Sequence, residues 1–166
     1  MSEIFLNVSS TMSRSRANGP GVRAVIWVQG CTIGCRGCYS ASTHLHEASS
    51  LHPPSEIAEW LQSIPDIEGV TFSGGEPFEQ AKAVRETIHA IREKNPALTF
   101  FSYTGFDLDV LQQTRDEDVE ELLGMLDMVS AGPYVHSERQ RNLLWRGSSN
   151  QKLHYLSDAY NKSQEA

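Results

Sequence analysis

The sequence predicts an α/β domain with a mostly parallel sheet. Short apolar segments rich in β-branched and aromatic residues alternate with segments whose apolar residues recur at helical spacing. Glycine-rich stretches follow two of the strand-like segments, and functional loops of such sheets lie at the carboxyl ends of the strands. The length of 166 residues fits one domain with one core. We expect this domain to span 1–156 and the tail 157–166 to be flexible.

Each element is supported by a local signal. A turn at 18–21 precedes the apolar segment 23–28, which favours a buried strand. Ser55 is the expected N-cap of a helix in which Ile57, Leu61 and Ile64 share one face. The second helix ends before Pro96, because the residue preceding a proline disfavours helical geometry. The expected strands are 4–8, 23–28, 69–73, 98–105 and 128–132, and the expected helices are 53–64, 81–94 and 117–127.

Charge and hydropathy exclude some classes of function. The formal net charge is -7, so nucleic acid and anionic membranes are not expected partners. No apolar segment approaches the roughly 20 residues that span a bilayer, and the first residues lack the pattern of an export signal. We therefore expect a cytoplasmic protein.

Charge is also unevenly distributed. Residues 105–127 are strongly acidic, which suits a solvated helix start. Residues 136–152 are basic, with Arg139, Arg141, Arg146 and Lys152. Trp145 beside Arg146 is typical of interface hot spots, but it is equally typical of a packed C-terminal segment. The segment from Arg139 to Lys152 is therefore either a docking surface or part of the core.

All three cysteines, Cys31, Cys35 and Cys38, lie in the stretch "GCTIGCRGC". An odd number of clustered thiols argues against a disulfide framework and for metal or redox chemistry. Three thiolates on a 4Fe-4S cluster would leave one iron open for another ligand, which favours the cluster. A Cys3His zinc site with His44 or His46, and a buried trio without a metal, remain alternatives.

Two further stretches stand near predicted strands. "SGGEP" (73–77) follows one strand and precedes a helix, so Gly74 and Gly75 can let a ligand approach the backbone while Glu76 supplies an acceptor. "NGPGVR" (18–23) reads as a turn with Arg23 on the surface. Taken alone, each is also compatible with an ordinary turn.

Together these stretches resemble a known family. The C-x3-C-x2-C spacing followed by Tyr39, with the Gly-Gly-Glu stretch, resembles the radical S-adenosylmethionine (SAM) superfamily. "NGPGVR" is similar to the opening of its glycyl-radical activating branch. "LLWRGSSNQ" (143–151) resembles a stretch of the anaerobic ribonucleotide reductase activating proteins. The resemblance covers about Asn18 to Gln151.

This resemblance implies a fold and an activity. The fold would be a shortened, single-domain partial (βα) barrel. Cys31, Cys35 and Cys38 would hold a 4Fe-4S cluster, and SAM would bind its open iron. A reduced donor such as flavodoxin would supply the electron that cleaves SAM to a 5'-deoxyadenosyl radical, which would take a hydrogen from a glycine of a large reductase subunit. The implied SAM contacts are Gly37, Cys38, Tyr39, Gly74, Gly75 and Glu76, with no further catalytic residue.

One departure from the family pattern bears on this function. An expected Asp-Gly-Pro reads Ala131-Gly132-Pro133, so the role of that carboxylate is lost or moves to Ser130 or Asp127. Activation of a different glycyl-radical enzyme, or modification of a peptide, is the alternative within the superfamily. A non-catalytic zinc or cluster-binding module is the alternative outside it.

Overall fold

The computed structural model describes residues 3–38 and 41–165, and that part of the chain contains seven strands and four α-helices. The strands are β1 (Leu6–Ser15), β2 (Arg23–Val28), β3 (Ser50–His52), β4 (Gly69–Gly74), β5 (Thr99–Thr104), β6 (Met128–Ala131) and β7 (Lys152–Tyr155). The helices are α1 (Pro54–Gln62), α2 (Ala81–Lys94), α3 (Leu108–Gln113) and α4 (Glu117–Met125). Single 3-10 turns lie at Ala41–Thr43, Pro77–Gln80, His136–Glu138 and Lys162–Glu165.

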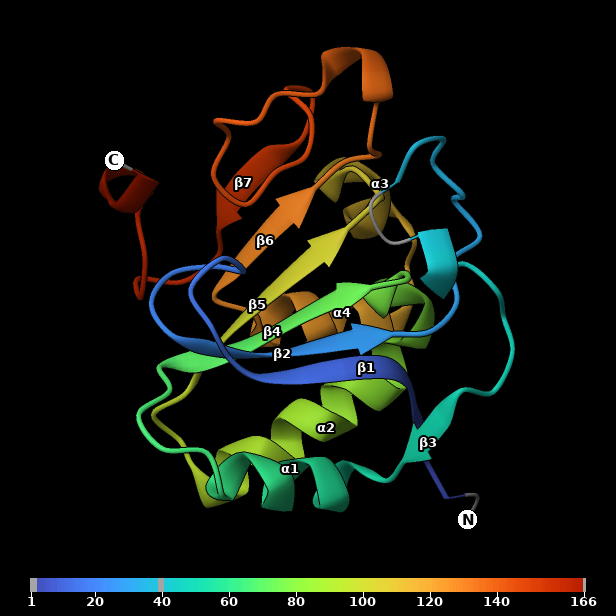
Figure 1. Cartoon of the computed structure of the whole chain (residues 1–166). Coiled ribbons are helices and arrows are strands. Elements are labelled where there is room, and N and C mark those ends of the chain that lie inside the picture. The colour runs from blue at the N-terminus through green and yellow to red at the C-terminus, as the bar shows by residue number, and fades with distance from the viewer. Residues whose placement is uncertain (1–2, 39–40, 166) are drawn as a thin grey trace.

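The strands form one sheet in the order β3-β1-β2-β4-β5-β6-β7 (Figure 1). Its centre, β2-β4-β5-β6, is parallel, and the connections between these strands contain the helices. β1 and β3 add antiparallel strands at one side, and β7 adds one at the other. The expected α/β class is confirmed, with a mixed sheet whose parallel strands are central.

The expected helices and central strands are present, and the differences have local causes. β3, α3 and β7 have three, six and four residues, which is too short to show a period in the sequence. The expected cap of the first helix was wrong, because α1 begins at Pro54 after Pro53 and Ser55 lies inside its first turn. Proline suits the first helical position, where no backbone N-H is needed.

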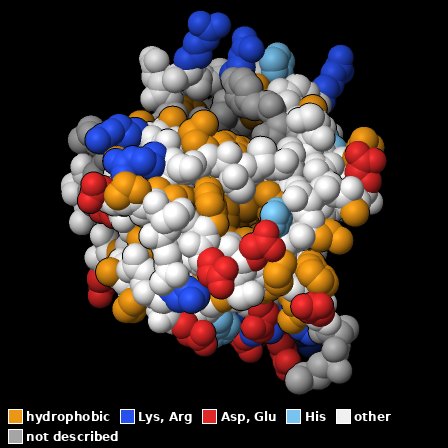
Figure 2. Space-filling model, turned by 60° about the horizontal axis from the view of Figure 1, so that its bottom comes forward, with side chains coloured by type: hydrophobic (Ala, Val, Ile, Leu, Met, Phe, Trp, Pro, Cys, Tyr) orange, Lys and Arg blue, Asp and Glu red, His pale blue; other side chains and the backbone are white. Residues whose placement is uncertain are grey.

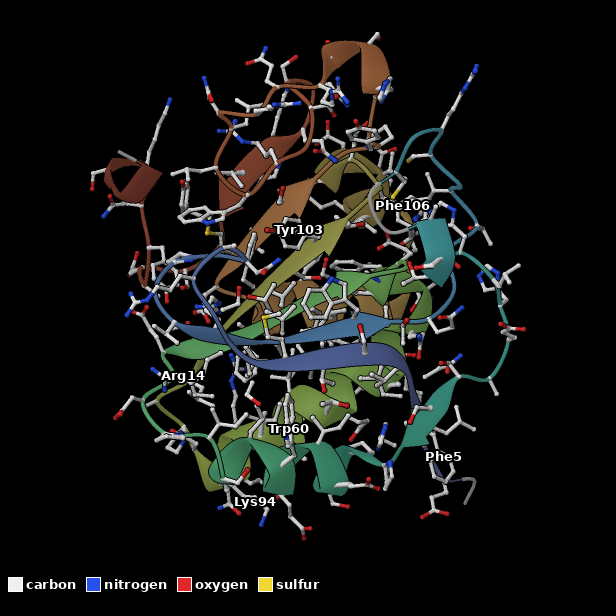
Figure 3. The ribbon with its side chains drawn as sticks, in the orientation of Figure 1. Phe5, Arg14, Trp60, Lys94, Tyr103 and Phe106 are labelled. Atoms are coloured by element: carbon white, nitrogen blue, oxygen red, sulfur yellow. The ribbon has the colours of Figure 1, made fainter. Side chains whose placement is uncertain are left out.

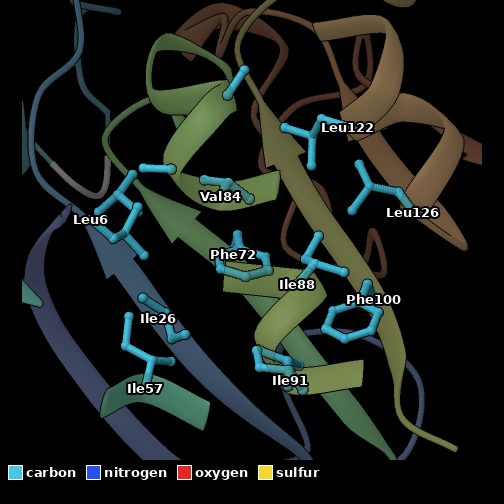
Figure 4. Close-up of a cluster of buried hydrophobic side chains, with 14 of the residues drawn as sticks. Leu6, Ile26, Ile57, Phe72, Val84, Ile88, Ile91, Phe100, Leu122 and Leu126 are labelled. Atoms are coloured by element: carbon cyan, nitrogen blue, oxygen red, sulfur yellow. The ribbon is translucent and has the colours of Figure 1, made fainter. Parts of the chain in front are cut away.

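The helices cover one face of the sheet, and alternation along the strands separates the two faces. In β5, Phe100 belongs to the main core with the helices, whereas Phe101 packs with Met128 and Tyr160 on the opposite face. Figure 1 shows α1, α2 and α4 on the same side. Figure 4 shows the resulting core, with Ile57 from α1, Ile88 from α2 and other apolar side chains packed against the strands.

Arg23 is buried on the face opposite the helices, so its expected surface position was wrong. Its exposed fraction is 0%. The guanidinium donates hydrogen bonds to the hydroxyls of Thr71 (2.8 Å) and Thr99 (2.9 Å) and to the carbonyl oxygens of Pro20, Val70 and Thr99. These contacts join β2 to β4 and β5. Burial lowers the pKa of Arg23, and hydrogen bonding to Tyr160 opposes that shift.

The segment after β7 returns to this buried arginine. Tyr160 is 5% exposed, and its hydroxyl lies 3.2 Å from the Arg23 guanidinium and 2.7 Å from the Thr99 hydroxyl. Part of the segment that we expected to be flexible is therefore anchored to the sheet. Among the described residues, no helix has the length and hydropathy that a bilayer-spanning segment requires.

Replacing Tyr160 with phenylalanine should therefore destabilise the fold. Loss of the hydroxyl removes its hydrogen bonds to the Arg23 guanidinium and the Thr99 hydroxyl, and one such bond typically contributes about 0.5 to 1.5 kcal/mol, or more when one partner is charged. Urea unfolding would measure the change in the free energy of unfolding. Tyr134→Phe is the matched control, because the Tyr134 hydroxyl contacts His136 at an exposed position. Equal effects of the two substitutions would contradict the anchoring role of Tyr160.

Candidate functional site

The cysteine loop and the "SGGEP" loop meet because they follow adjacent parallel strands. β2 leads into the cysteines and β4 leads into Gly74-Gly75-Glu76, and Val28 is in register with Gly74. The N-H of Gly75 donates to the carbonyl oxygen of Val28, and the N-H of Glu76 donates to that of Gly30, both at 2.8 Å. Both loops lie at the carboxyl ends of the parallel strands, as expected for an active site in such a sheet.

Glycine is required at the contact between these loops. A Cβ at Gly75 would lie 2.3 Å from the carbonyl oxygen of Gly30, and one at Gly74, whose φ is 95°, would lie 2.7 Å from the Val28 nitrogen. The N-H groups of Gly75 and Glu76 are thus used between the loops. We expected a ligand to approach this backbone closely. At the N-H groups of Gly75 and Glu76, the chain around Val28 and Gly30 lies in that place instead.

A cavity of about 300 Å³ lies where the loops meet. It is lined by all three cysteines and by Gly74, Gly75 and Glu76, so two motifs separated in the sequence share one space. Its floor is formed by side chains on the face opposite the helices. Trp27 on β2 is in register with Ser73 on β4, and Tyr103 on β5 with Ser130 on β6. Figure 3 shows Tyr103 on β5 and Phe106 just beyond the end of that strand.

Not every expected contact residue lines this cavity. Gly37 is absent from its lining; it has φ 76°, and a Cβ there would lie 2.9 Å from His136 Nδ1. Its place between Cys35 and Cys38 is therefore explained by the close approach of His136. Tyr39 lies outside the described residues.

The cysteine loop fits an iron-sulfur cluster in its donor chemistry. The three cysteines form no disulfide, and each is partly exposed. Burial raises the pKa of the Cys31 thiol, and hydrogen bonds from the backbone of Gly34 and Ile33 act in the opposite direction. Such N-H groups directed at sulfur are typical of cluster sites. Within residues 3–38 and 41–165, no three His, Cys, Asp or Glu side chains are arranged around one point to hold a metal ion.

Glu76 is a buried carboxylate, 1% exposed, at the wall of the cavity. Its Oε1 accepts hydrogen bonds from the Thr104 hydroxyl (2.8 Å) and the Phe78 N-H (3.1 Å), and its Oε2 accepts one from the Gly105 N-H (2.7 Å). Burial raises the pKa of Glu76 to about 7, although these hydrogen bonds oppose the shift. Glu76 therefore links the "SGGEP" loop to the end of β5.

The residues of the cavity floor carry no motif that marks them in the sequence. Tyr103 is half-buried there; loss of contact with water raises the pKa of its phenol, and a hydrogen bond to Asn18 opposes that shift. Asn18 also accepts a hydrogen bond from the Ser15 hydroxyl (2.8 Å). Strand alternation places Tyr103 on the same face as Phe101, but only the pairing of the strands shows that this face carries the site.

The carboxylate missing at position 131 is not replaced by Asp127. Asp127 precedes β6, where its carboxylate accepts from the Phe100 N-H (2.7 Å) and the Ser157 hydroxyl (2.7 Å). Ser130 does line the cavity, and its hydroxyl donates to the carbonyl oxygen of Trp145 (2.7 Å). Ala131 itself is 2% exposed. Ser130 is thus the one of the two expected substitutes that lies at the site.

The segment from Arg139 to Lys152 combines an exposed part and an anchored part. We call residues 135–147 the arm. Its tip is exposed at Arg139 and Arg141, and its base is held because Gln151 Oε1 accepts from the N-H groups of Gly147 (2.7 Å) and Ser148 (3.1 Å). Trp145 is half-buried, with its ring 6.3 Å from that of Phe101. Gln151 and Gly147 also line the cavity, so the arm borders its mouth.

A second hollow lies away from the cysteines. It has a volume of about 220 Å³ and is lined by Val8, Thr11, Ile26, His52, Glu56, Ile57 and Trp60. Figure 2 shows hydrophobic side chains gathered in a hollow at the middle of one face, with acidic side chains below it. None of the cysteines contributes to it, so it is separate from the candidate site.

Comparison with known proteins identifies the family. The model of the 4Fe-4S single cluster domain family matches residues 17–154. The anaerobic ribonucleoside-triphosphate reductase-activating protein of Vibrio cholerae is 30% identical over 143 residues, covering 82% of this chain and 90% of that protein. The proteins of the same name from Escherichia coli K12 and Enterobacteria phage T4 are 28% and 29% identical, covering 84% and 82% of this chain and 92% and 85% of their own.

Among solved structures, QueE from Escherichia coli matches with a TM-score of 0.45 and 14% identity, over 62% of this chain and 53% of that one. The family match spans most of the chain, including the cysteine loop and the "SGGEP" loop. The chain therefore belongs to the 4Fe-4S single cluster domain family and, within it, to the anaerobic ribonucleoside-triphosphate reductase-activating proteins.

Proposed function

We propose that this protein generates a glycyl radical on an anaerobic ribonucleoside-triphosphate reductase by reductive cleavage of SAM. One observation carries the proposal: the three thiols and the Gly-Gly-Glu loop line the same cavity. Relatives over most of the chain carry the name of that reductase's activating protein. We also propose that the protein acts in the cytoplasm and that the sheet is the shortened partial (βα) barrel of the superfamily.

The residues divide between holding the cofactors and shaping the cavity. Cys31, Cys35 and Cys38 would hold a 4Fe-4S cluster. When bound and reduced by a donor such as flavodoxin, that cluster would supply the electron that converts SAM to methionine and a 5'-deoxyadenosyl radical. Gly74, Gly75 and Glu76 would contact SAM from the neighbouring loop, and Gly37, Cys38 and Tyr39 from the cysteine loop. The protein's own contribution is orientation and exclusion of water.

Glu76 has a defined part in this proposal. Its bonds to Thr104, Gly105 and Phe78 hold the carboxylate in one place, and Oε2, which accepts the Gly105 N-H, retains acceptor capacity for a ligand. A carboxyl group whose pKa is about 7 is partly ionised at neutral pH. A cationic amino group placed beside it would favour the ionised form. SAM carries such a group, so its binding and the ionisation of Glu76 would support each other.

The reductase would complete the cavity. The arm borders the mouth and contacts the cysteine loop through His136 and Gly37. It carries Arg139 and Arg141 at exposed positions in a chain whose net charge is -7. A basic surface at the mouth would orient an acidic partner segment, because complementary charge steers association. A glycine Cα of the partner would then enter the cavity from this side.

The decisive experiment is radical transfer in the absence of oxygen. Protein reconstituted with iron and sulfide, mixed with a chemical reductant, SAM and an anaerobic ribonucleoside-triphosphate reductase, should produce the doublet of a glycyl radical in electron paramagnetic resonance (EPR). Cys35→Ala should reduce the doublet to background, whereas Ser49→Ala, at an exposed position, should leave it unchanged. A colourless wild-type protein that binds zinc, with no reduced cluster responsive to SAM, would refute the proposal.

The stability of the protein should fall as pH rises toward neutrality because of Glu76. The pKa is about 7 in the folded protein against 4.5 for the free side chain, so between these values the folded state binds more protons than the unfolded state. Each pH unit in that window costs up to about 1.4 kcal/mol of stability. Urea unfolding at pH 5.5, 6.5 and 7.5 should show this decline in the wild type and a smaller one in Glu76→Gln. Parallel profiles would show that Glu76 titrates normally.

Reversing the charge of the arm should weaken binding of the reductase. We expect the double substitution Arg139→Glu and Arg141→Glu to raise the dissociation constant at least about tenfold at low salt, and less at high salt, where charges are screened. The control reverses Lys82 and Lys94, exposed residues of α2, the helix at the opposite end of the molecule from the arm (Figures 1 and 3). Equal binding by the arm variant and the control variant would exclude the arm as a docking surface.

A further inference from the structure

A cluster of three side chains outside the cysteine motif holds the cysteine loop in place. Glu79 Oε1 accepts hydrogen bonds from the Thr32 N-H, at 2.8 Å, and from the Thr32 hydroxyl. Its other oxygen, Oε2, pairs with His46 Nε2 at 2.9 Å. Thr32 directly follows Cys31, so the Glu79 carboxylate is hydrogen-bonded to the loop at the residue next to the first cysteine. The cluster did not emerge from the sequence because its members lie far apart in the chain.

His46 contacts the loop on the other side of Cys31, at Gly30. A Cβ on Gly30 would lie 2.9 Å from His46 Cδ2, so the imidazole rests against the backbone that precedes the first cysteine. The same segment is held through its main chain: the N-H of Gly30 donates to the Thr43 carbonyl oxygen (2.6 Å) and that of Cys31 to the His44 carbonyl oxygen (3.1 Å). Glu79 therefore links the start of the cysteine loop, at Thr32, to the segment after the loop, at His46.

The position of Glu79 joins this cluster to the second loop. It lies in the 3-10 turn Pro77–Gln80, three residues after Glu76. Glu76 caps that turn, because its carboxylate accepts from the Phe78 N-H. The carboxylate of Glu79 is therefore not needed as the cap. Its carboxylate points instead to Thr32 and His46. The strand-to-turn segment that carries Gly74–Glu76 thus contacts the cysteine loop twice, through the backbone at Gly30 and through Glu79.

Glu79 is charged where it makes these contacts. Partial burial alone would raise the pKa of Glu79, but hydrogen bonds from Thr32 and His46 outweigh burial and hold it below the ordinary range. Glu79 Oε1 accepts from the N-H of Thr32 at 2.8 Å, and Thr32 directly follows Cys31, so this negative charge lies close to the first thiol. A fixed negative charge close to a redox centre disfavours addition of an electron there.

We propose that Glu79 is a positioning residue for the cysteine loop, which orients Cys31 through Thr32 and His46 and sets how readily a cluster on that loop accepts an electron. The proposal rests on the proposed function, because it assumes that the loop binds a cluster. Two separable properties follow. Retention of the cluster depends on the reach of the side chain, and the reduction potential depends on its charge.

Three substitutions separate reach from charge in the full-length, reconstituted protein. Glu79→Gln keeps the length and one acceptor oxygen but removes the charge, so the midpoint potential should shift to a more positive value. Glu79→Asp keeps the charge but cannot span Thr32 and His46 together, so an iron chelator should remove the cluster about tenfold faster, as for other residues that support metal ligands. Glu79→Ala should show both effects. Glu59→Gln, at an exposed position on α1, is the control.

The measurements are iron and sulfide per chain, the midpoint potential from an EPR-monitored redox titration, and the rate of iron loss to the chelator. Wild-type potential in Glu79→Gln together with wild-type retention in Glu79→Asp would overturn the proposal. If Glu79→Ala fails to fold, the potential of Glu79→Gln still decides. A wild-type protein that binds no cluster would overturn the proposed function itself, whereas a wild-type cluster unaffected by all three variants would overturn only the role of Glu79.

Discussion

The buried carboxylate of Glu76 is the interaction on which the site depends. The backbone N-H of Glu76 donates to the carbonyl oxygen of Gly30. In its side chain, Oε1 accepts from Thr104 and Phe78, and Oε2 accepts from Gly105. These bonds join the loops after β2, β4 and β5, the three strands at the centre of the seven-stranded sheet. Burying a carboxylate is costly unless hydrogen bonds compensate for the lost water. Burial outweighs these hydrogen bonds and raises the pKa of Glu76, and groups with perturbed pKa values cluster at functional sites.

The division of the sheet into two faces makes room for this site. Helices α1, α2 and α4 cover one face and bury the apolar residues that stabilise the fold. At one end of the other face Arg23 binds Thr71, Thr99 and Tyr160, and at the other end Trp27, Ser73, Tyr103 and Ser130 line the cavity. Arg23 therefore secures the strands at the end remote from the cysteines. The hydrogen bonds of Arg23 and the cavity lie on the same face of the sheet, which the helices do not cover.

The sequence predicted the chemistry of the site better than its shape. The cysteines and the Gly-Gly-Glu stretch could be recognised from local spacing, because each motif is contiguous in the chain. Tyr103, Gln151 and Glu79 could not, because their relation to the cysteines arises only when β2, β4, β5 and β6 pair in register. Arg23 was expected on the surface because the stretch that contains it reads as a turn. Only the assembled sheet supplies the six hydrogen bonds that make its burial possible.

The sequence by itself determined the α/β class, the order of the main strands and helices, and the thiol-rich loop after the first buried strand. These features depend on periodicity and on contacts between near neighbours, which a linear chain already contains. Three features were decided by the tertiary structure alone. The backbone of Gly30 leaves no room for a side chain at position 75, Glu79 is hydrogen-bonded to Thr32 and His46, and the arm borders the cavity. Such contacts join residues far apart in the chain, so no local pattern encodes them.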